Sequence, residues 1–221
     1  MKRIVTVFLA CAAIATTMSA RQVQLKSPDG RNSVEITTDG EISYTLHRDS
    51  KPITECNRLS INVDGTEWGK SQKCTSVKRR SVSQSHTVPV PRRSREVADV
   101  YNEITLSYKG YNVEFRAYNE GIAYRFVSCS KKADKVNGET VNFNIDGNAM
   151  TYTQLTNRMQ QWFEYNYTER RFASLPTDSL IILPMLASVN GYQVLLAEAD
   201  VYDYPGIYLR RNGSGLFGDF A

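Results

Sequence analysis

Apolar and polar residues alternate in the middle of the chain, on both sides of a glycine turn. In residues 104–108 and 113–117 an apolar side chain occupies every second position, and Lys109-Gly110 separates the two runs. This period of two predicts an antiparallel β-hairpin with one buried face. After the turn signal Asn119-Glu120-Gly121, residues 122–126 return as a third strand. Three neighbouring strands with one apolar face predict the centre of a sheet on which other strands dock.

Shorter alternating runs, each ended by a turn signal, flank this centre. They predict strands at residues 22–26, 33–37, 42–46, 58–63, 141–145 and 192–199. Turns spaced about 8–12 residues apart are typical of a sandwich or barrel. Pro184 is expected to end the apolar run Leu180–Met185, and no closing strand is expected after Leu209. The 13 tyrosines also favour strands over helices. The pattern therefore predicts an all-β, antiparallel sandwich.

Residues 69–95 differ from the rest because they are rich in Lys and Arg and nearly free of acids. The segment could bind a polyanion, or it could be a solvated edge ribbon whose charges block edge pairing. Aromatic stacking partners are missing from it, which favours the ribbon. The net charge of +4 is too small to indicate nucleic acid as a partner.

The first 20 residues have the features of an export signal. Lys2 and Arg3 precede an apolar run, and Ser19-Ala20 closes that run with small residues. This predicts a signal peptide at residues 1–20, a mature chain at 21–221 and a periplasmic or secreted location. The run is too short for a comfortable transmembrane segment. Cys11 leaves an outer-membrane lipoprotein as the alternative.

The mature chain keeps three cysteines, Cys56, Cys74 and Cys129. A Cys56–Cys74 disulfide with one free thiol is the simplest arrangement in an oxidising compartment, and three unpaired cysteines are the alternative. With His47 and His86 as the only histidines, a histidine-rich metal site is excluded. No nucleophile elbow, P-loop or zinc-protease motif occurs either.

Several stretches resemble the N-terminal domain of glycoside hydrolase family 97, which comprises bacterial α-glucosidases and α-galactosidases. The similar residues follow the order and spacing of that family and span nearly the whole mature chain. They are Ser27-Pro28-Asp29-Gly30, Tyr101–Leu106, Phe115–Phe126, Glu164–Thr168 and Glu198–Leu209. The resemblance implies a large twisted β-sandwich of the galactose-mutarotase type, packed on a (β/α)8 catalytic barrel.

The resemblance also implies that the chain ends inside the first domain, before its last strands and the barrel. The barrel carries the two carboxylates that glycoside hydrolysis requires, so no catalytic residue is assigned here. The expected function is a non-catalytic scaffold or carbohydrate-binding domain of an enzyme that cuts α-linked oligosaccharides. The alternative is a stand-alone secreted β-sandwich that binds carbohydrate or another partner. Whether the chain is itself an enzyme stays open, although inactivity is expected of it alone.

One site residue follows from the resemblance. Glu164, in Glu164-Tyr165-Asn166-Tyr167-Thr168, matches a glutamate that helps the barrel to bind calcium in the glucosidase members. One carboxylate does not make a calcium site, which takes six to eight oxygens, so no metal is expected to bind without the barrel. Read alone, Glu164 would be a surface carboxylate in an aromatic loop.

The remaining expectations concern aromatic and charged residues late in the chain. Trp162 and Tyr165, with Phe163 and Tyr167, could stack on a sugar, but such clusters are more often core or interdomain contacts. We expect the tyrosines at 202, 204 and 208 to lie in the core or at the same interface. Glu198 and Asp200 are expected to pair with Arg210 or Arg211.

Overall fold

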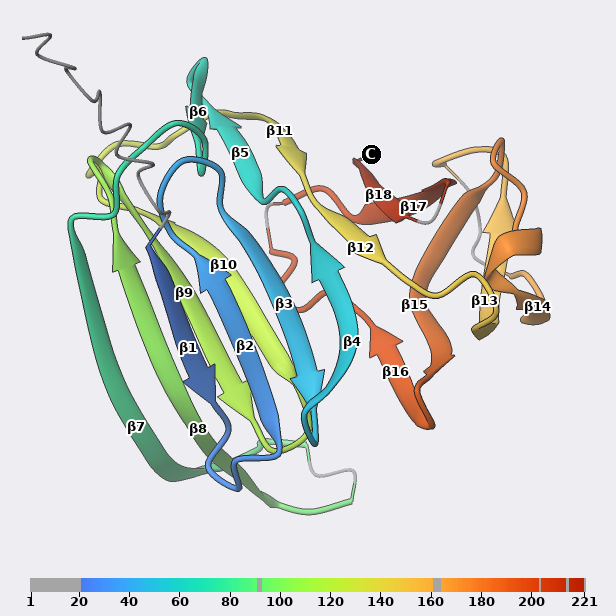
Figure 1. The fold of residues 1–221 in the computed structure, drawn as a ribbon, viewed down its shortest axis with the longest axis horizontal. Coiled ribbons are helices and arrows are strands. Elements are labelled where there is room, and N and C mark those ends of the chain that lie inside the picture. The colour runs from blue at the N-terminus through green and yellow to red at the C-terminus, as the bar shows by residue number, and fades with distance from the viewer. Residues whose placement is uncertain (1–20, 91–92, 161–163, 203, 214, 221) are drawn as a thin grey trace, which may run out of the picture.

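The computed structural model describes residues 21–90, 93–160, 164–202, 204–213 and 215–220. Eighteen strands make up nearly all of its regular structure (Figure 1). The 3₁₀ turn η1 (Phe172–Ser174) is the only helical element among the described residues. No helix within these ranges has the length and apolarity to cross a membrane. The prediction of an all-β, antiparallel fold is confirmed.

The largest sheet has eleven strands and runs across the whole molecule. Its order is β1-β2-β3-β4-β12-β18-β17-β15-β13-β14, with β16 paired to β15. The strands are β1 (Gln22–Lys26), β2 (Asn32–Thr37), β3 (Ser43–Arg48), β4 (Lys51–Cys56), β12 (Asn142–Asn144), β13 (Met150–Thr156), β14 (Thr168–Arg171), β15 (Leu180–Val189), β16 (Tyr192–Leu196), β17 (Ile207–Asn212) and β18 (Gly215–Phe220).

Two smaller sheets complete the fold. The sheet predicted from the central alternation has the order β10-β9-β8-β7 and lies behind β1 to β4 in Figure 1. Its strands are β7 (Ser76–Thr87), β8 (Glu96–Ser107), β9 (Tyr111–Tyr118) and β10 (Ile122–Ser128). A three-stranded sheet has the order β11-β5-β6, with β5 (Ser60–Val63), β6 (Thr66–Trp68) and β11 (Val136–Thr140).

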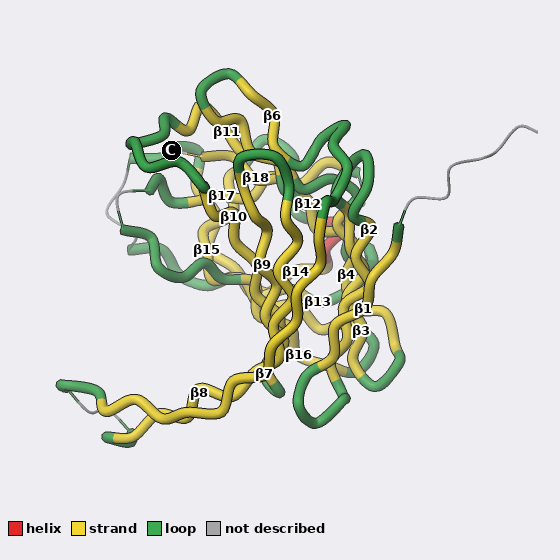
Figure 2. The backbone as a smooth tube through the Cα atoms, turned by 90° about the vertical axis from the view of Figure 1, so that its left-hand side faces the viewer, coloured by secondary structure: helices red, strands yellow, loops and turns green. Residues whose placement is uncertain are grey.

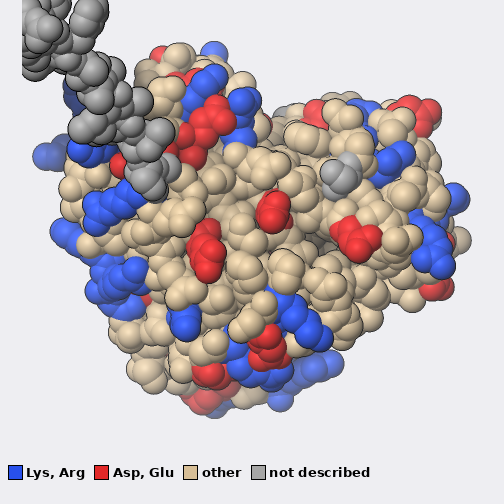
Figure 3. Space-filling model, viewed as in Figure 1, with Lys and Arg blue, Asp and Glu red and all other residues tan. Residues whose placement is uncertain are grey.

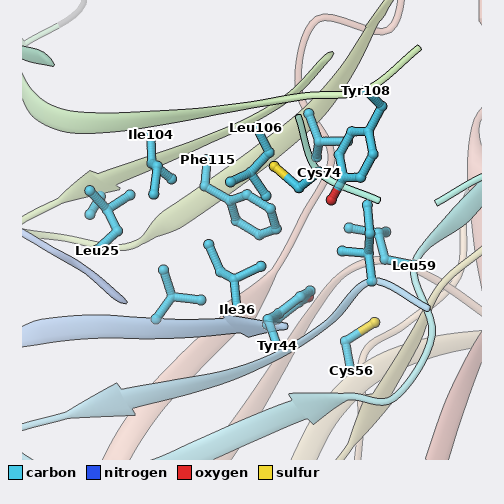
Figure 4. Packing of buried hydrophobic residues seen from close by; sticks show 14 of the residues in the cluster. Leu25, Ile36, Tyr44, Cys56, Leu59, Cys74, Ile104, Leu106, Tyr108 and Phe115 are labelled. Atoms are coloured by element: carbon cyan, nitrogen blue, oxygen red, sulfur yellow. The ribbon is translucent and has the colours of Figure 1, made fainter. Parts of the chain in front are cut away.

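The main core fills the space between the first strands of the large sheet and the four-stranded sheet. Leu25 and Ile36 from one layer face Ile104, Leu106 and Phe115 from the other (Figure 4). All five side chains are buried. Burying an aliphatic or phenyl side chain of this size contributes about 1.5–3 kcal/mol. The alternation that predicted these strands thus also selected the side chains that hold the two layers together.

A second core belongs to the later strands. Ile181, Met185, Leu209 and Leu216 pack there with Phe172 of η1, and all five are fully buried. Ile207 contacts both cores and so joins the two parts of the molecule. The large sheet is therefore held by one core on each of its halves.

An aromatic stack closes one end of the main core. The Tyr111 ring stacks on Trp68 with centroids 4.7 Å apart and on Tyr108 at 4.9 Å. The Tyr111 hydroxyl accepts a 2.7 Å hydrogen bond from the backbone N–H of Gly69. Gly69 has φ of +84° and lies against the Leu59 carbonyl, where an added Cβ would come within 2.3 Å. Only glycine fits this connection between the sheets.

Two sequence expectations about the strands were wrong. A closing strand does exist, because β18 pairs with β17 on one side and with β12 on the other. β15 continues through Pro184 to Val189 instead of ending there. The register against β13 shifts between Tyr152↔Leu186 and Gln154↔Ile182, so Pro184 lies in a bulge that needs no N–H donor.

The expected edge ribbon is present. β7 is the outermost strand of its sheet, and most of its side chains are exposed. Together with β8 it forms a long hairpin that projects from the body (Figure 2).

The expected Cys56–Cys74 disulfide is absent, and the alternative of three unpaired cysteines holds. Cys56 and Cys74 are free and buried in the main core, while Cys129 is free and exposed. The two buried thiols pack as small apolar side chains, and burial raises the pKa of both.

Candidate docking face around Glu164

The segment that carries Glu164 connects β13 to β14 and lies against the outer face of the large sheet. Paired residues on neighbouring strands project from the same face. The register therefore places Gln154, Ile182, Tyr208 and Asp219 in one row across β13, β15, β17 and β18. The core residue Leu209 alternates with this row, so the row faces away from the second core.

Two side chains of the row fix the segment to the sheet. The Tyr208 hydroxyl donates a 2.5 Å hydrogen bond to the Met159 carbonyl, and Met159 packs on a small buried cluster of Leu180, Ile182 and Tyr208. The Gln154 amide donates to the carbonyl of Tyr165. The position of Glu164 is thus set by neighbours that are anchored in a sheet, although Glu164 itself has no regular secondary structure.

Glu164 precedes two exposed aromatic residues, Tyr165 and Tyr167. It is exposed, and within the described part of the chain it makes no hydrogen bond or ion pair. Tyr165 is 40% exposed and Tyr167 55%. Phe217 of β18, also 40% exposed, projects from the same outer face, because it is paired with Arg210, two residues from Tyr208. We call Gln154, Glu164, Tyr165, Tyr208, Arg210, Phe217 and Asp219 the Glu164 face.

An ion pair keeps the β17–β18 side of this face in place. The Arg210 guanidinium donates to the Asp219 carboxylate at 2.9 Å and also to the Asp178 carbonyl at 3.3 Å. Arg210 and Asp219 are each more than a third exposed, so the pair is worth little in free energy. It orients the two side chains beside Phe217 and leaves no free charge there.

The described residues do not form a metal site by themselves. No group of three or more His, Cys, Asp or Glu side chains is close enough to bind an ion in the ranges that the structure covers. Calcium takes six to eight oxygen ligands, and Glu164 supplies at most two. Glu164 can therefore act only as one ligand of a metal ion, and the other ligands would have to come from outside the described residues.

The other expected site residues have separate environments. Trp162 and Phe163 lie outside the described residues. Tyr208 is buried, as expected. The Tyr204 hydroxyl donates a 2.7 Å hydrogen bond to Glu139, whose pKa burial raises. Tyr202 is 84% exposed, so it does not lie in the core, and its place at an interdomain contact stays a prediction.

The expected ion pairs of Glu198 and Asp200 do not form among the described residues. Arg210 is engaged by Asp219, and Arg211 donates to the Leu175 carbonyl at 2.6 Å. Glu198 instead accepts the backbone N–H of Ile207 at 3.0 Å. The sequence analysis also missed Gln154, Arg210, Phe217 and Asp219 as members of the face. Their common row depends on strand register, which no local motif indicates.

A family model described as Glycosyl-hydrolase 97 N-terminal matches residues 25–220. A retaining alpha-galactosidase of Bacteroides thetaiotaomicron is 31% identical over 221 positions, which cover 95% of this chain and 33% of that protein.

Two solved structures have the same fold. A glycoside hydrolase family 97 enzyme from Pseudoalteromonas sp. strain K8, in complex with acarbose, matches with a TM-score of 0.76 and 22% identity over 90% of this chain and 32% of that one. A beta-arabinopyranosidase matches with a TM-score of 0.73 and 20% identity over 90% and 35%. The chain thus spans about a third of the length of the relatives that it matches.

Proposed function

Because this chain belongs to the glycosyl-hydrolase 97 N-terminal family, we propose that it is the non-catalytic β-sandwich that supports the catalytic domain of an α-glycoside hydrolase. The proposal rests on the Glu164 face, which combines exposed aromatic side chains with a carboxylate that has no partner among the described residues. Aromatic side chains of this kind are enriched at protein interfaces. The substrate class follows from the relative named a retaining alpha-galactosidase and is an α-linked oligosaccharide.

In this proposal the Glu164 face binds the catalytic domain. Tyr165 and Phe217, with the neighbouring Tyr167, supply apolar contact area, and a buried core holds this half of the sheet together. A rigid surface loses little conformational entropy on docking, which favours a lasting domain contact. The same tyrosines could alternatively stack on a sugar, as could Trp162, and the experiment below separates the two roles.

We further propose that Glu164 donates one carboxylate ligand to a calcium ion whose other ligands belong to the catalytic domain. Carboxylate oxygens suit a hard cation, and the exposed position of Glu164 leaves it accessible to a partner. Bound there, calcium would supply positive charge at the boundary between the two domains. Export to the periplasm or beyond, directed by residues 1–20, belongs to the same proposal.

A chimera tests this function. This chain would replace the matching third of the Bacteroides thetaiotaomicron retaining alpha-galactosidase, and α-galactoside hydrolysis would be measured against calcium concentration. We expect Glu164→Gln to raise the calcium concentration for half-maximal activity about tenfold or more, because a neutral amide is a weaker ligand. Glu120→Gln, an exposed change in the β9–β10 turn, is the matched control and should have no effect.

Two outcomes would contradict the proposal. If the Glu164→Gln and Glu120→Gln chimeras need the same calcium concentration for half-maximal activity, Glu164 is not a calcium ligand. If this chain alone binds α-linked oligosaccharide and Tyr165→Ala abolishes that binding, the stand-alone carbohydrate-binding module is the better account.

A further inference from the structure

The sandwich is open along one side, where the four-stranded sheet extends past the edge of the large sheet. β1 is the last strand of the large sheet, and β7 is the last strand of the four-stranded sheet. In Figure 1, β7 lies beyond the edge of β1, so part of the rear sheet is uncovered. A groove of about 570 Å³ lies there, lined by residues 24–26 of β1, 79–81 of β7 and Asn102 and Glu103 of β8. A second hollow of about 350 Å³, which also contacts Ser81 and Asn102, extends past Pro28.

The backbone of β1 faces this groove with unpaired groups. The Lys26 carbonyl accepts a 2.9 Å hydrogen bond from the Asn102 side chain, so Lys26 directs its backbone away from β2. Backbone groups alternate in direction along an antiparallel strand, so the N–H and C=O of Gln24 also point into the groove. No described strand pairs with this edge of β1.

The floor of the groove is polar and shallow. Val77 of β7 packs on the main core, so the alternating residues Arg79, Ser81 and Ser83 face the same inner side. These three side chains are exposed. Serine side chains fill little of the layer between the sheets. The floor beside β1 is therefore open and polar, and it disfavours an apolar occupant.

The groove carries net positive charge. Lys26 and Arg79 make no ion pair with any described residue. Glu103, the one acidic residue of the lining, directs its side chain to the opposite face of β8, where Arg80 binds it at 2.5 Å and Arg116 at 2.8 Å. Figure 3 shows Lys and Arg side chains along the left margin, where Figure 1 places β7. A second copy of this chain would bring further Lys and Arg to the groove, which opposes self-association there.

From these observations we propose that the groove binds an extended, acidic polypeptide segment as an added strand on β1. Its backbone would pair with the N–H and C=O of Gln24, as in other complexes formed by strand addition. Asp or Glu side chains on its inner face would meet Arg79, and those on its outer face would lie beside Lys26. The site lies on strands that the Glu164 face does not include, so its test is independent of the proposed glycosidase role.

The test uses a fluorescein-labelled peptide of alternating glutamate and threonine and the purified protein, with binding followed by fluorescence polarisation. We expect Arg79→Glu to weaken binding about tenfold or more, a change of about 1.4 kcal/mol. Lys132→Glu, an exposed charge reversal in the β10–β11 loop, should change binding less than about twofold. The corresponding lysine–threonine peptide should not bind.

A second comparison tests the backbone pairing itself. The same acidic peptide, N-methylated at every residue, keeps its charge but has no backbone N–H to donate to a strand edge. We expect it to lose binding, and we expect Gln24→Pro to lose binding while the protein stays folded, because proline is tolerated on an edge strand. If Gln24→Pro does not fold, the N-methylated peptide still decides the question.

Three results would overturn the proposal. The acidic peptide could fail to bind, Arg79→Glu could bind it as tightly as the native protein, or the N-methylated peptide could bind as well as its parent. If trigalacturonic acid binds in an Arg79-dependent way and the peptide does not, the groove is a site for acidic sugars instead.

Discussion

At the scale of single residues, the main question is how the protein stabilises a buried carboxylate. Glu103 on β8 is 3% exposed, yet it projects from the face of its strand opposite to the core residue Ile104. Arg80 from β7 and Arg116 from β9 donate to its two oxygens, and Arg116 also lies 4.7 Å from the ring of Tyr101. Burying an unpaired carboxylate would be costly, so these two partners make its burial possible.

The pH dependence of stability follows from this arrangement. Hydrogen bonding from Arg80, the largest cause, holds the pKa of Glu103 below its usual value. Since this pKa is lower in the folded state, ionised Glu103 stabilises the protein above about pH 4.3, the unfolded value, and the gain is lost as the pH falls through the folded-state pKa.

We therefore expect Glu103→Gln to lower the free energy of unfolding by about 2 kcal/mol at pH 7. The difference from the native protein should shrink towards zero in acid below the folded-state pKa. Urea denaturation at pH 7 and pH 3 measures it, with the exposed change Glu120→Gln as the control. An equal loss at both pH values would show that packing, and not charge, is what the glutamate supplies.

Alternation in the sequence predicted that Ile104 faces the core. It could not predict that Glu103 is buried, because its partners lie 23 and 13 residues away and reach it only through the strand register. The same limit applies to Arg210, which pairs with Asp219 across β17 and β18 instead of with Glu198 or Asp200.

At the scale of elements, Gly69 determines how the chain passes from β6 towards β7. Its carbonyl accepts from Ile42, its N–H donates to Tyr111, and its Cα faces the Leu59 carbonyl. Gly110, in the β8–β9 turn, also has positive φ, +91°, but an added Cβ there would meet nothing within 4 Å. The two glycines share a backbone conformation and differ in the space around them.

We expect Gly69→Ala to destabilise the protein by about 3 kcal/mol or more, because strain from positive φ adds to a backbone clash. Gly110→Ala should cost only about 1–2 kcal/mol, the strain alone. Thermal unfolding of both variants measures the difference. Equal losses of stability would mean that the contact between Gly69 and the Leu59 carbonyl can relax to accommodate a Cβ atom.

The central meander could be predicted because its signals are local, with alternation and a turn at residues 109–110 and again at 119–121. β18 and the second half of β15 could not be predicted in the same way. β18 has glycine at Gly215 and Gly218 and forms because β12 and β17 provide partners on both sides. Pro184 is accommodated by a bulge against β13, which depends on a distant strand.

At the scale of the whole molecule, family membership and fold agree while the role of the Glu164 face stays a proposal. The sequence resemblance selected Glu164 from its motif, and the structure shows that Glu164 and its sequence neighbours Tyr165 and Tyr167 are exposed. The large sheet has separate cores on its two halves, so the Glu164 face and the β1 groove rest on different packing. A substitution on one surface therefore leaves the core beneath the other surface untouched.

Hydrogen exchange of this chain, alone and within the chimera, tests the docking claim most directly. If the Glu164 face contacts the catalytic domain, backbone amides at residues 164–167 and in β17 and β18 should exchange about tenfold more slowly in the chimera, while β7 and β8 keep their rates. Unchanged exchange at residues 164–167 and β18, with slowing at β7 and β8 instead, would contradict the account and place the interface on the opposite side of the molecule.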